Sequence, residues 1–266
     1  MDKKEALRRQ PCFSSHIAGS TYCKEDAEVN PLLLTQAFAD AAQRTGVDIR
    51  THTEVTNIEV KHGKVTSVQT SKGNIATELV INAAGPFARE IAKMAHADVP
   101  IKPRRGAILI TEKVKPIIHG SVLCSQYLAA KHLSSEENVP PFGIGLSLGQ
   151  TESGNLLIGG SREFVGFNQT VSMDVFSEIA YHACRIAPVL RNLRIIRTMV
   201  GFRPFTGDGL PIIDEVEEAK GFIIAAGHEG DGIALAPITG KLVADLVKGE
   251  KNELLAPLRL ERFMSE

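Results

Sequence analysis

One stretch of the sequence joins an apolar run to a turn in which the backbone is open to a ligand. Phe222 to Ala226 is continuously apolar, and Gly227 to Ile233 then contains three glycines before a helical pattern begins. Glycine lets a backbone pass close to a ligand, and the free amides at a helix start attract negative charge. We therefore expect a buried strand, a ligand-binding turn and a helix, with a plain structural turn as the alternative.

Two titratable side chains lie close to this stretch in the sequence. Arg203 ends an apolar strand pattern just before Pro204, where its guanidinium suits bidentate binding of a carboxylate. The alternative for Arg203 is an ion pair with Asp208 or Asp214. His228 fits three roles, a base, a hydrogen-bond donor or a core histidine, and we treat it with Arg203 as a catalytic candidate.

A third pattern formally matches a serine hydrolase. Residues Gly145 to Gly149 fit G-x-S-x-G around Ser147, and an aspartate and then His228 follow in the order of that class. The mechanism needs a strand, a sharp turn and a helix, whereas turn formers after Gly149 lead into another strand pattern. A hairpin explains these residues better, so a hydrolase using Ser147 and His228 is the weaker alternative.

The elements that must position these residues belong to regions with two different patterns of secondary structure. Before residue 100 and after residue 203, strands alternate with helices, which is typical of a nucleotide-binding layer. After an irregular start over 1–25, the predicted elements are a helix over 32–44 capped by Asn30, a strand over 47–50, a hairpin of 55–60 and 65–70, a strand over 79–81, a helix ending near 95, a strand over 221–226 and a helix over 233–247.

The middle of the chain has longer strands and more glycines. Its predicted elements are strands over 108–110, 144–146, 156–158 and 195–202, a polar loop over 134–141 and a helix over 173–186. The fold class is therefore α/β (α+β), a partial Rossmann-like layer over 1–99 and 204–266 that a mostly antiparallel β-sheet substrate domain over 100–203 interrupts.

Composition excludes several functional classes. The 266 residues carry a formal net charge of −1, so no global basic field is present for nucleic acid. The longest apolar runs are far below the roughly 20 residues of a membrane span, and the start has no signal-peptide pattern. Four cysteines without a C-x-x-C pair, Cys12, Cys23, Cys124 and Cys184, predict reduced thiols, a cytoplasmic location and no metal site.

Taken together, six segments resemble the family of FAD-dependent amine and D-amino-acid oxidoreductases, which includes glycine oxidase and the sarcosine oxidase β-subunit. They run in the family's order from about Glu28 to Val247, and the last two are the most specific. The segments are Glu28–Pro31, Val80–Ala88, Pro103–Gly106, Ile158–Glu163, Gly201–Asp214 and Gly227–Gly240.

The resemblance implies FAD as cofactor and oxidation of a C–N bond, with hydride transfer to flavin N5 and hydrolysis of the imine product. It implies that Arg203 clamps a substrate carboxylate, that Val55 supplies a backbone contact near the adenine, and that the N-A-A-G motif lines the FAD groove. The implied flavin contacts are Ala83, Ala84 and Gly85, together with Gly227, His228, Glu229, Gly230, Asp231, Gly232 and Ile233.

The chain also departs from this family, because it has no glycine-rich fingerprint for the FAD pyrophosphate. We expect a truncated or split-gene form with a partner subunit that supplies the missing N-terminal unit or accepts electrons, or else a non-catalytic subunit or remnant. The isolated chain is expected to bind FAD weakly or not at all. No cysteine lies between Val200 and Asp214, so the FAD is expected to be non-covalent. The expected substrate is a small amine or amino acid.

Overall fold

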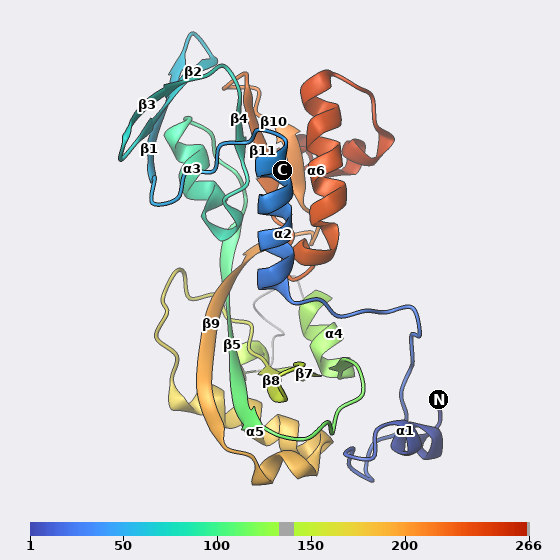
Figure 1. Cartoon of the computed structure of the whole chain (residues 1–266). Helices are drawn as coiled ribbons and strands as arrows, with labels where there is room; N and C mark the ends of the chain where they lie inside the picture. Colours follow the sequence, from blue (N-terminus) through green and yellow to red (C-terminus); the bar gives the residue numbers. More distant parts are fainter. Residues whose placement is uncertain (133–140, 265–266) are drawn as a thin grey trace. The chain divides into compact units, whose positions relative to one another are not determined.

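The computed structural model describes residues 1–132 and 141–264, and the chain forms two units (Figure 1). One unit comprises residues 30–104 and 203–266, and the other comprises residues 1–29 and 105–202. Strands β5 (Lys102–Lys113) and β9 (Ile195–Phe205) each run across a boundary between units. The functional roles assigned to 1–99, 100–203 and 204–266 remain predictions.

The first unit is built on a three-stranded sheet in the order β10 (Ile212–Glu215), β11 (Phe222–Ala226), β4 (Val80–Asn82). Strand β11 is parallel to β4 and antiparallel to β10. All five residues of β11 are buried, which explains why its sequence is continuously apolar rather than alternating. This central strand leads directly into the glycine-rich loop.

Helices flank that sheet. Helix α6 (Gly232–Lys248) follows the loop and ends at Gly249 in the left-handed conformation, while α3 (Ala88–Met94) follows a 3-10 turn after β4. Helix α2 (Pro31–Arg44) begins at Asn30, whose side chain accepts from the two amides of Leu32 and Leu33. The helices predicted over 32–44 and 233–247 are confirmed. Two 3-10 segments, Glu253–Leu258 and Leu260–Phe263, complete the unit.

A second sheet of this unit contains the predicted hairpin. Strands β1 (Val55–Lys61) and β2 (Lys64–Thr70) pair antiparallel, and β3 (Gly73–Ala76) adds a third strand. His62 and Gly63 in the two-residue turn both have positive φ, 51° and 73°, as tight hairpin turns require. The sequence did not predict β3, because its four residues are all exposed and show no apolar alternation.

The other unit holds a five-stranded sheet in the order β6-β7-β8-β5-β9, with β6 (Val122–Leu123), β7 (Ser147–Gln150) and β8 (Asn155–Gly159). The pairs β6–β7, β7–β8 and β5–β8 are antiparallel, which confirms the mixed class with an antiparallel sheet. Helix α5 (Met173–Ile186) buries Val175, Ile179 and Ala183 at helical spacing in this unit's core.

Three local predictions were wrong. Residues 47–50 form no strand, because the Val47 amide closes the end of α2 on the Ala42 carbonyl, and no strand within the described ranges pairs with this segment. Residues 144–146 precede β7: the Leu146 amide donates to the Cys124 sulfur, while Gly145 exchanges two backbone hydrogen bonds with Gly160, just beyond the end of β8. The start expected to be irregular contains α1 (Lys3–Arg9), capped by the Asp2 side chain.

Helix α4 (Ser125–His132) also went unpredicted. The polar loop expected over 134–141 falls, except for residue 141, outside the described residues.

Among the helices of the described ranges, none has both the length and the apolar character needed to cross a membrane. All four cysteines are free thiols.

Candidate active site

All of the predicted site residues belong to the unit formed by 30–104 and 203–266. Strands β4 and β11 are parallel neighbours, with Asn82 beside Ile224, so both strands end at the same edge of the sheet. Ligands of open α/β sheets bind outside the carboxyl ends of the strands. The structure thus brings the Ala83–Gly85 turn and the Gly227–Ile233 loop to one edge, whereas Val55 starts a strand of a different sheet.

The turn after β4 is organised by a side chain that sequence reasoning did not assign to the site. Asn82 is buried, donates its amide to the Ala88 carbonyl at 2.8 Å, and accepts the Ala84 amide at 3.2 Å. Gly85 has a φ of +55°, and within the part of the chain that the structure describes, a Cβ added there would meet no atom within 4 Å. Asn82 therefore fixes a turn whose surface stays open, and its place in the N-A-A-G motif is the signal from which it could have been found.

The loop after β11 requires glycine at its first position. Gly227 has a φ of +91°, and a Cβ there would lie 2.7 Å from the Thr206 methyl group. Thr206 is fully buried, so that methyl group has little room to move. The loop is thereby held against the segment that carries Arg203.

Several loop amides are already bound to protein acceptors. The Glu229 amide donates to the Pro204 carbonyl at 3.0 Å, the Asp231 amide to the His228 carbonyl at 3.0 Å, and the Gly230 amide to the Glu229 carboxylate. The first-turn amides of α6, from Gly232 to Ala234, have no acceptor within their own helix. These amides form the part of the loop suited to a partly negative ligand atom.

His228 lies at the start of this loop and contacts the helix that follows. Its Nε2 is 2.8 Å from the Thr239 hydroxyl. Burial lowers the pKa of His228 below its usual range, against the opposing effect of the Asp231 carboxylate. A neutral imidazole is therefore favoured at neutral pH, which suits a hydrogen-bonding role more than that of a fixed cation.

Three charged side chains gather between β5, β9 and the loop. Glu229 Oε1 is 3.7 Å from Arg104 Nη1 and 3.8 Å from Arg203 Nε. The Arg104 side chain is completely buried and its guanidinium carbon lies 5.0 Å from the centre of the Phe205 ring, whereas the Arg203 side chain is 22% exposed. Sequence reasoning did not assign Arg104 to the site, although it lies within the Pro103–Gly106 segment.

The alternative of a local ion pair for Arg203 is wrong. Asp208 is paired with Arg262 at 2.6 Å, and Asp214 accepts the Leu260 amide at 2.9 Å. The charged partner found for Arg203 is instead Glu229, a residue that is distant in sequence.

The serine hydrolase alternative is also wrong. Ser147 begins β7, which pairs antiparallel with β8 through a tight turn. A nucleophile elbow requires a strand that turns sharply into a helix, and no helix follows Ser147 in the chain before β8. The G-x-S-x-G match is a hairpin strand.

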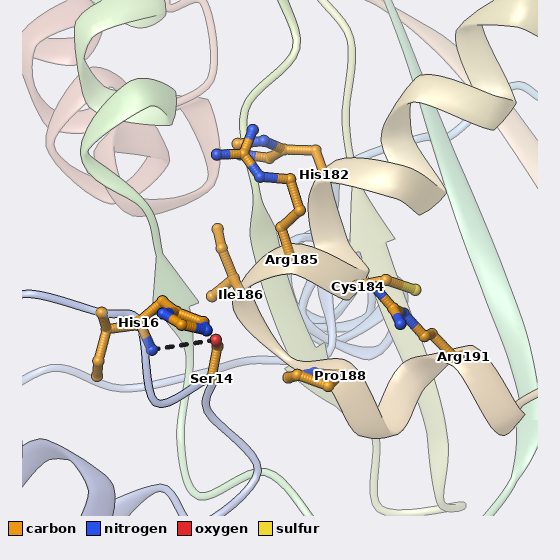
Figure 2. Close-up of a pocket in the computed structure, with 9 residues that line it drawn as sticks. Ser14, His16, His182, Cys184, Arg185, Ile186, Pro188 and Arg191 are labelled. Carbon is orange, nitrogen blue, oxygen red and sulfur yellow. Dashed lines mark hydrogen bonds between the residues drawn. The ribbon is translucent and has the colours of Figure 1, made fainter.

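A cavity of about 540 Å³ lies in the other unit, and none of the predicted site residues lines it (Figure 2). It lies beside the end of α5 and combines two arginines with two histidines. The lining residues are Ser14, His16, Ile17, His182, Cys184, Arg185, Ile186, Pro188 and Arg191. The cavity and the glycine-rich loop belong to different units and are formed by different segments of the sequence.

The loop fits a flat, electron-rich cofactor ring. Gly230 is exposed, and a Cβ added there would meet no atom of the described residues within 4 Å. Ala83 is exposed and the Ile233 side chain is half exposed, so open glycine backbone and apolar side chains border the first-turn amides of α6. These are the features that an isoalloxazine requires: apolar contact for its faces and amide donors for its carbonyl oxygens.

Comparisons with known proteins agree with this arrangement. The model of the family described as FAD dependent oxidoreductase (DAO) matches residues 1–246. The chain is 31% identical to hydrogen cyanide synthase subunit HcnC of Pseudomonas aeruginosa over 270 residues, which is all of this chain and 60% of HcnC. The chain thus spans about 60% of the length of that relative.

Two solved structures have the same fold. L-proline dehydrogenase from P. horikoshii is 28% identical with a TM-score of 0.87, over 99% of this chain and 68% of that one. Glycine oxidase from Geobacillus kaustophilus is 28% identical with a TM-score of 0.83, over 98% of this chain and 65% of that one. This protein belongs to the DAO family of FAD-dependent oxidoreductases.

Proposed function

We propose that this chain carries the flavin-facing and substrate-facing residues of an oxidoreductase that oxidises a C–N bond in an amine or amino acid. The observation that carries the proposal is the arrangement at one sheet edge. An open glycine-rich loop and the amide end of α6 lie next to a buried cluster that contains Arg203. The flavin, when bound, supplies the acceptor for the hydride that leaves the substrate carbon.

The chain's own residues bind and orient the reactants. The amides of Gly232 to Ala234 stabilise negative charge on the ring's carbonyl side, and Arg203 binds the substrate carboxylate. His228, held by Thr239, keeps the loop in place with a neutral side chain. Orientation of a neutral amine against the flavin contributes more to such a reaction than a strong side-chain base.

The proposed substrate is a small amino acid with a free carboxylate. Two of the similar proteins are named for glycine and for L-proline, which fits a compact carboxylate ligand at Arg203. Non-covalent binding of FAD and a cytoplasmic location, both predicted above, belong to this proposal. A non-catalytic subunit of the same family is the second candidate, since the similar protein HcnC is itself named as a subunit.

A second polypeptide segment carrying a dinucleotide-binding unit is the proposed partner. Apolar side chains on α2 and β4 are solvent-exposed, among them Leu32 at 80%, Leu33 at 68% and Ile81 at 44%. Apolar patches of this kind usually mark an interaction surface. The similar protein HcnC is itself named as a subunit, which agrees with an assembly of more than one chain.

Flavin binding tests the proposed site directly. The purified chain is titrated with FAD while the visible spectrum and flavin fluorescence are recorded, and the sample is then desalted. We expect binding at high FAD concentration and loss of the flavin on desalting, because the pyrophosphate fingerprint is absent. A matched pair of variants, Gly230→Leu and Gly240→Leu, places the same side chain at two positions where an added Cβ meets no atom of residues 1–132 and 141–264 within 4 Å.

The two variants separate a loop site from binding elsewhere. Gly230→Leu is expected to weaken FAD binding at least tenfold, whereas Gly240→Leu on the body of α6 leaves it unchanged. Equal binding by both variants would remove the loop from the flavin site. No binding by the wild-type chain at millimolar FAD would favour the non-catalytic candidate.

A further inference from the structure

The cavity beside the end of α5 combines cationic and apolar side chains. Its volume of about 540 Å³ is typical of a small-molecule site. All of its lining residues belong to the unit formed by 1–29 and 105–202. Of the nine described residues that line it, two are arginines and none is an aspartate or a glutamate. The charge of this lining favours an anionic ligand.

Arg185 and Arg191 supply the fixed positive charge of the cavity. The guanidinium carbon of Arg185 lies 6.0 Å from the centre of the Tyr181 ring, and Arg191 interacts with the Cys184 thiol. Neither guanidinium has a carboxylate within 4 Å among residues 1–132 and 141–264. The planar fork of a guanidinium matches the geometry of phosphate oxygens, and two such groups match the charge of a phosphate dianion.

The N-terminal loop over 14–17 forms another part of the lining and is held to the end of α5. The Ser14 amide donates to the Ile186 carbonyl at 2.7 Å, and Ser14 Oγ accepts the His16 amide at 3.2 Å (Figure 2). Ser14 is only 8% exposed. Since its oxygen accepts that amide, its own hydroxyl proton is kept for donation to a further acceptor. Ser14 thus offers a fixed donor at the wall of the cavity.

The end of α5 is prepared for an anion in a second way. The last carbonyls of a helix carry partial negative charge, which repels an anion. Here the Ala183 carbonyl accepts the Ala187 amide, and the Ile186 carbonyl accepts the Ser14 amide. These hydrogen bonds use two of the carbonyls next to the cavity and reduce that repulsion.

A carboxylate does occur on the same helix. Glu178 lines a second cavity of about 260 Å³, which shares Arg185 and His182 with the larger one. Burial and the charge of Arg185 lower the pKa of His182, against the opposing effect of Glu178. His182 is therefore an uncharged wall of both cavities at neutral pH, and the two arginines remain the cations of the larger one.

We propose that the larger cavity binds a small phosphate monoester. Arg185 and Arg191 supply the charge that attracts the phosphate, and the Ser14 hydroxyl donates to one of its oxygens. The cavity is larger than a phosphate ion, so the apolar side chains of Ile17 and Ile186 contact the organic part of the ligand. This site lies in the other unit from the glycine-rich loop and is independent of the proposed oxidoreductase function.

Binding of phenyl phosphate to the full chain tests the proposal, with phenol and acetate as controls. Line broadening in phosphorus NMR and proton NMR gives the dissociation constants at constant ionic strength. We expect phenyl phosphate to bind about tenfold more tightly than either control, because only phenyl phosphate combines a dianion with an apolar body. Equal binding of phenyl phosphate and acetate excludes a phosphate site.

Arginine variants locate the binding. Arg185→Gln and Arg191→Gln are each expected to weaken phenyl phosphate binding about tenfold. The matched control is Arg197→Gln, which removes an exposed arginine of β9 in the same unit, outside the lining of the cavity, and is expected to leave binding unchanged. Circular dichroism checks that each variant is folded. The proposal is overturned if the two cavity variants bind as wild type does, or if all three variants lose affinity equally.

A measurement on the wild-type chain keeps the test decisive if a cavity variant fails to fold. Cys184 lines the cavity, whereas Cys23 is exposed and does not. Both thiols are alkylated with iodoacetamide and followed by peptide mass spectrometry. Burial raises the pKa of the Cys184 thiol, so its reaction is followed over long times. Saturating phenyl phosphate is expected to slow alkylation of Cys184 about fivefold and to leave Cys23 unchanged. Absence of protection at Cys184, or equal protection of both thiols, contradicts a ligand in this cavity.

Discussion

Helices α2 and α6 belong to the same unit, and both follow from clear sequence signals, yet their apolar side chains have different surroundings. Helix α6 buries Leu242 and Val243 in a cluster with Ile213 and Ala225 of the sheet. Helix α2 has no buried residue, and its Leu33 is 68% exposed. Similar local patterns therefore produced one helix that packs in the core and one whose apolar residues face solvent.

The difference shows that helix formation and helix burial have separate causes. A cap, a periodic pattern and a terminating glycine suffice to define where a helix begins and ends. Burial depends on a partner surface, which β10 and β11 provide for α6.

The largest effect is expected at the glycines next to these helices. Gly227 and Gly46 have nearly the same φ, +91° and +94°, but an added Cβ clashes with Thr206 only at Gly227. Gly227→Ala is expected to destabilise the chain by about 4 kcal/mol, and Gly46→Ala by about 1 kcal/mol. Chemical unfolding followed by circular dichroism gives both values, and equal losses would show that the clash relaxes freely.

Leucine truncation compares the buried and exposed faces. Leu242 in α6 is 3% exposed, and Leu242→Ala is expected to cost about 3 kcal/mol because it leaves a cavity. Leu33→Ala in α2 is expected to change stability by less than about 0.5 kcal/mol. The same unfolding experiment measures both variants. A large loss for Leu33→Ala would mean that α2 is covered in solution, for instance by a second copy or by a partner.

The cap of α2 tests how far that helix depends on local interactions. Asn30→Ala removes the acceptor for the Leu32 and Leu33 amides and is expected to cost about 1 kcal/mol of helix stability. Because α2 buries no residue, the loss should appear as faster amide exchange within α2 rather than as a lower Tm of the whole chain. Asn30→Asp, which keeps an acceptor, is the control. A drop in Tm equal to that of a core variant would contradict this separation.

The smallest effect is expected from pH acting on His228. Burial lowers its pKa in the folded chain, so the unfolded chain binds more protons between that pKa and the ordinary value near 6.5. The contribution of neutral His228 to the free energy of unfolding is present above pH 6.5 and is lost as the pH falls through this window. His182, whose pKa burial also lowers, adds an effect of the same sign.

Variants isolate the contribution of His228. His228→Gln is expected to flatten part of the decline in Tm between about pH 7.5 and pH 5.5. Identical pH profiles for wild type and His228→Gln would show that this histidine does not titrate in the window.

Much of the fold could be predicted because its signals are local. The boundaries of α5 over 173–186, the hairpin around His62 and Gly63, and buried strand β11 all follow from periodicity and turn residues. The errors at 47–50 and 144–146 have the opposite origin. Apolar residues there suggested strands, but the Val47 amide is bound by a helix carbonyl and the Leu146 amide by a cysteine sulfur, which the apolar pattern does not indicate.

The sequence by itself determined the glycine-rich loop, its flanking strand and helix, and the family to which the chain belongs, because glycine, capping residues and apolar runs act within a few residues of one another. Only the tertiary structure decided which charges meet. Arg203 had nearby aspartates in sequence, but Arg262 and a backbone amide bind them, while Glu229 of the loop lies within ion-pair distance of both Arg203 and Arg104. Electrostatic partners depend on distance in space, which the order of residues along the chain does not specify.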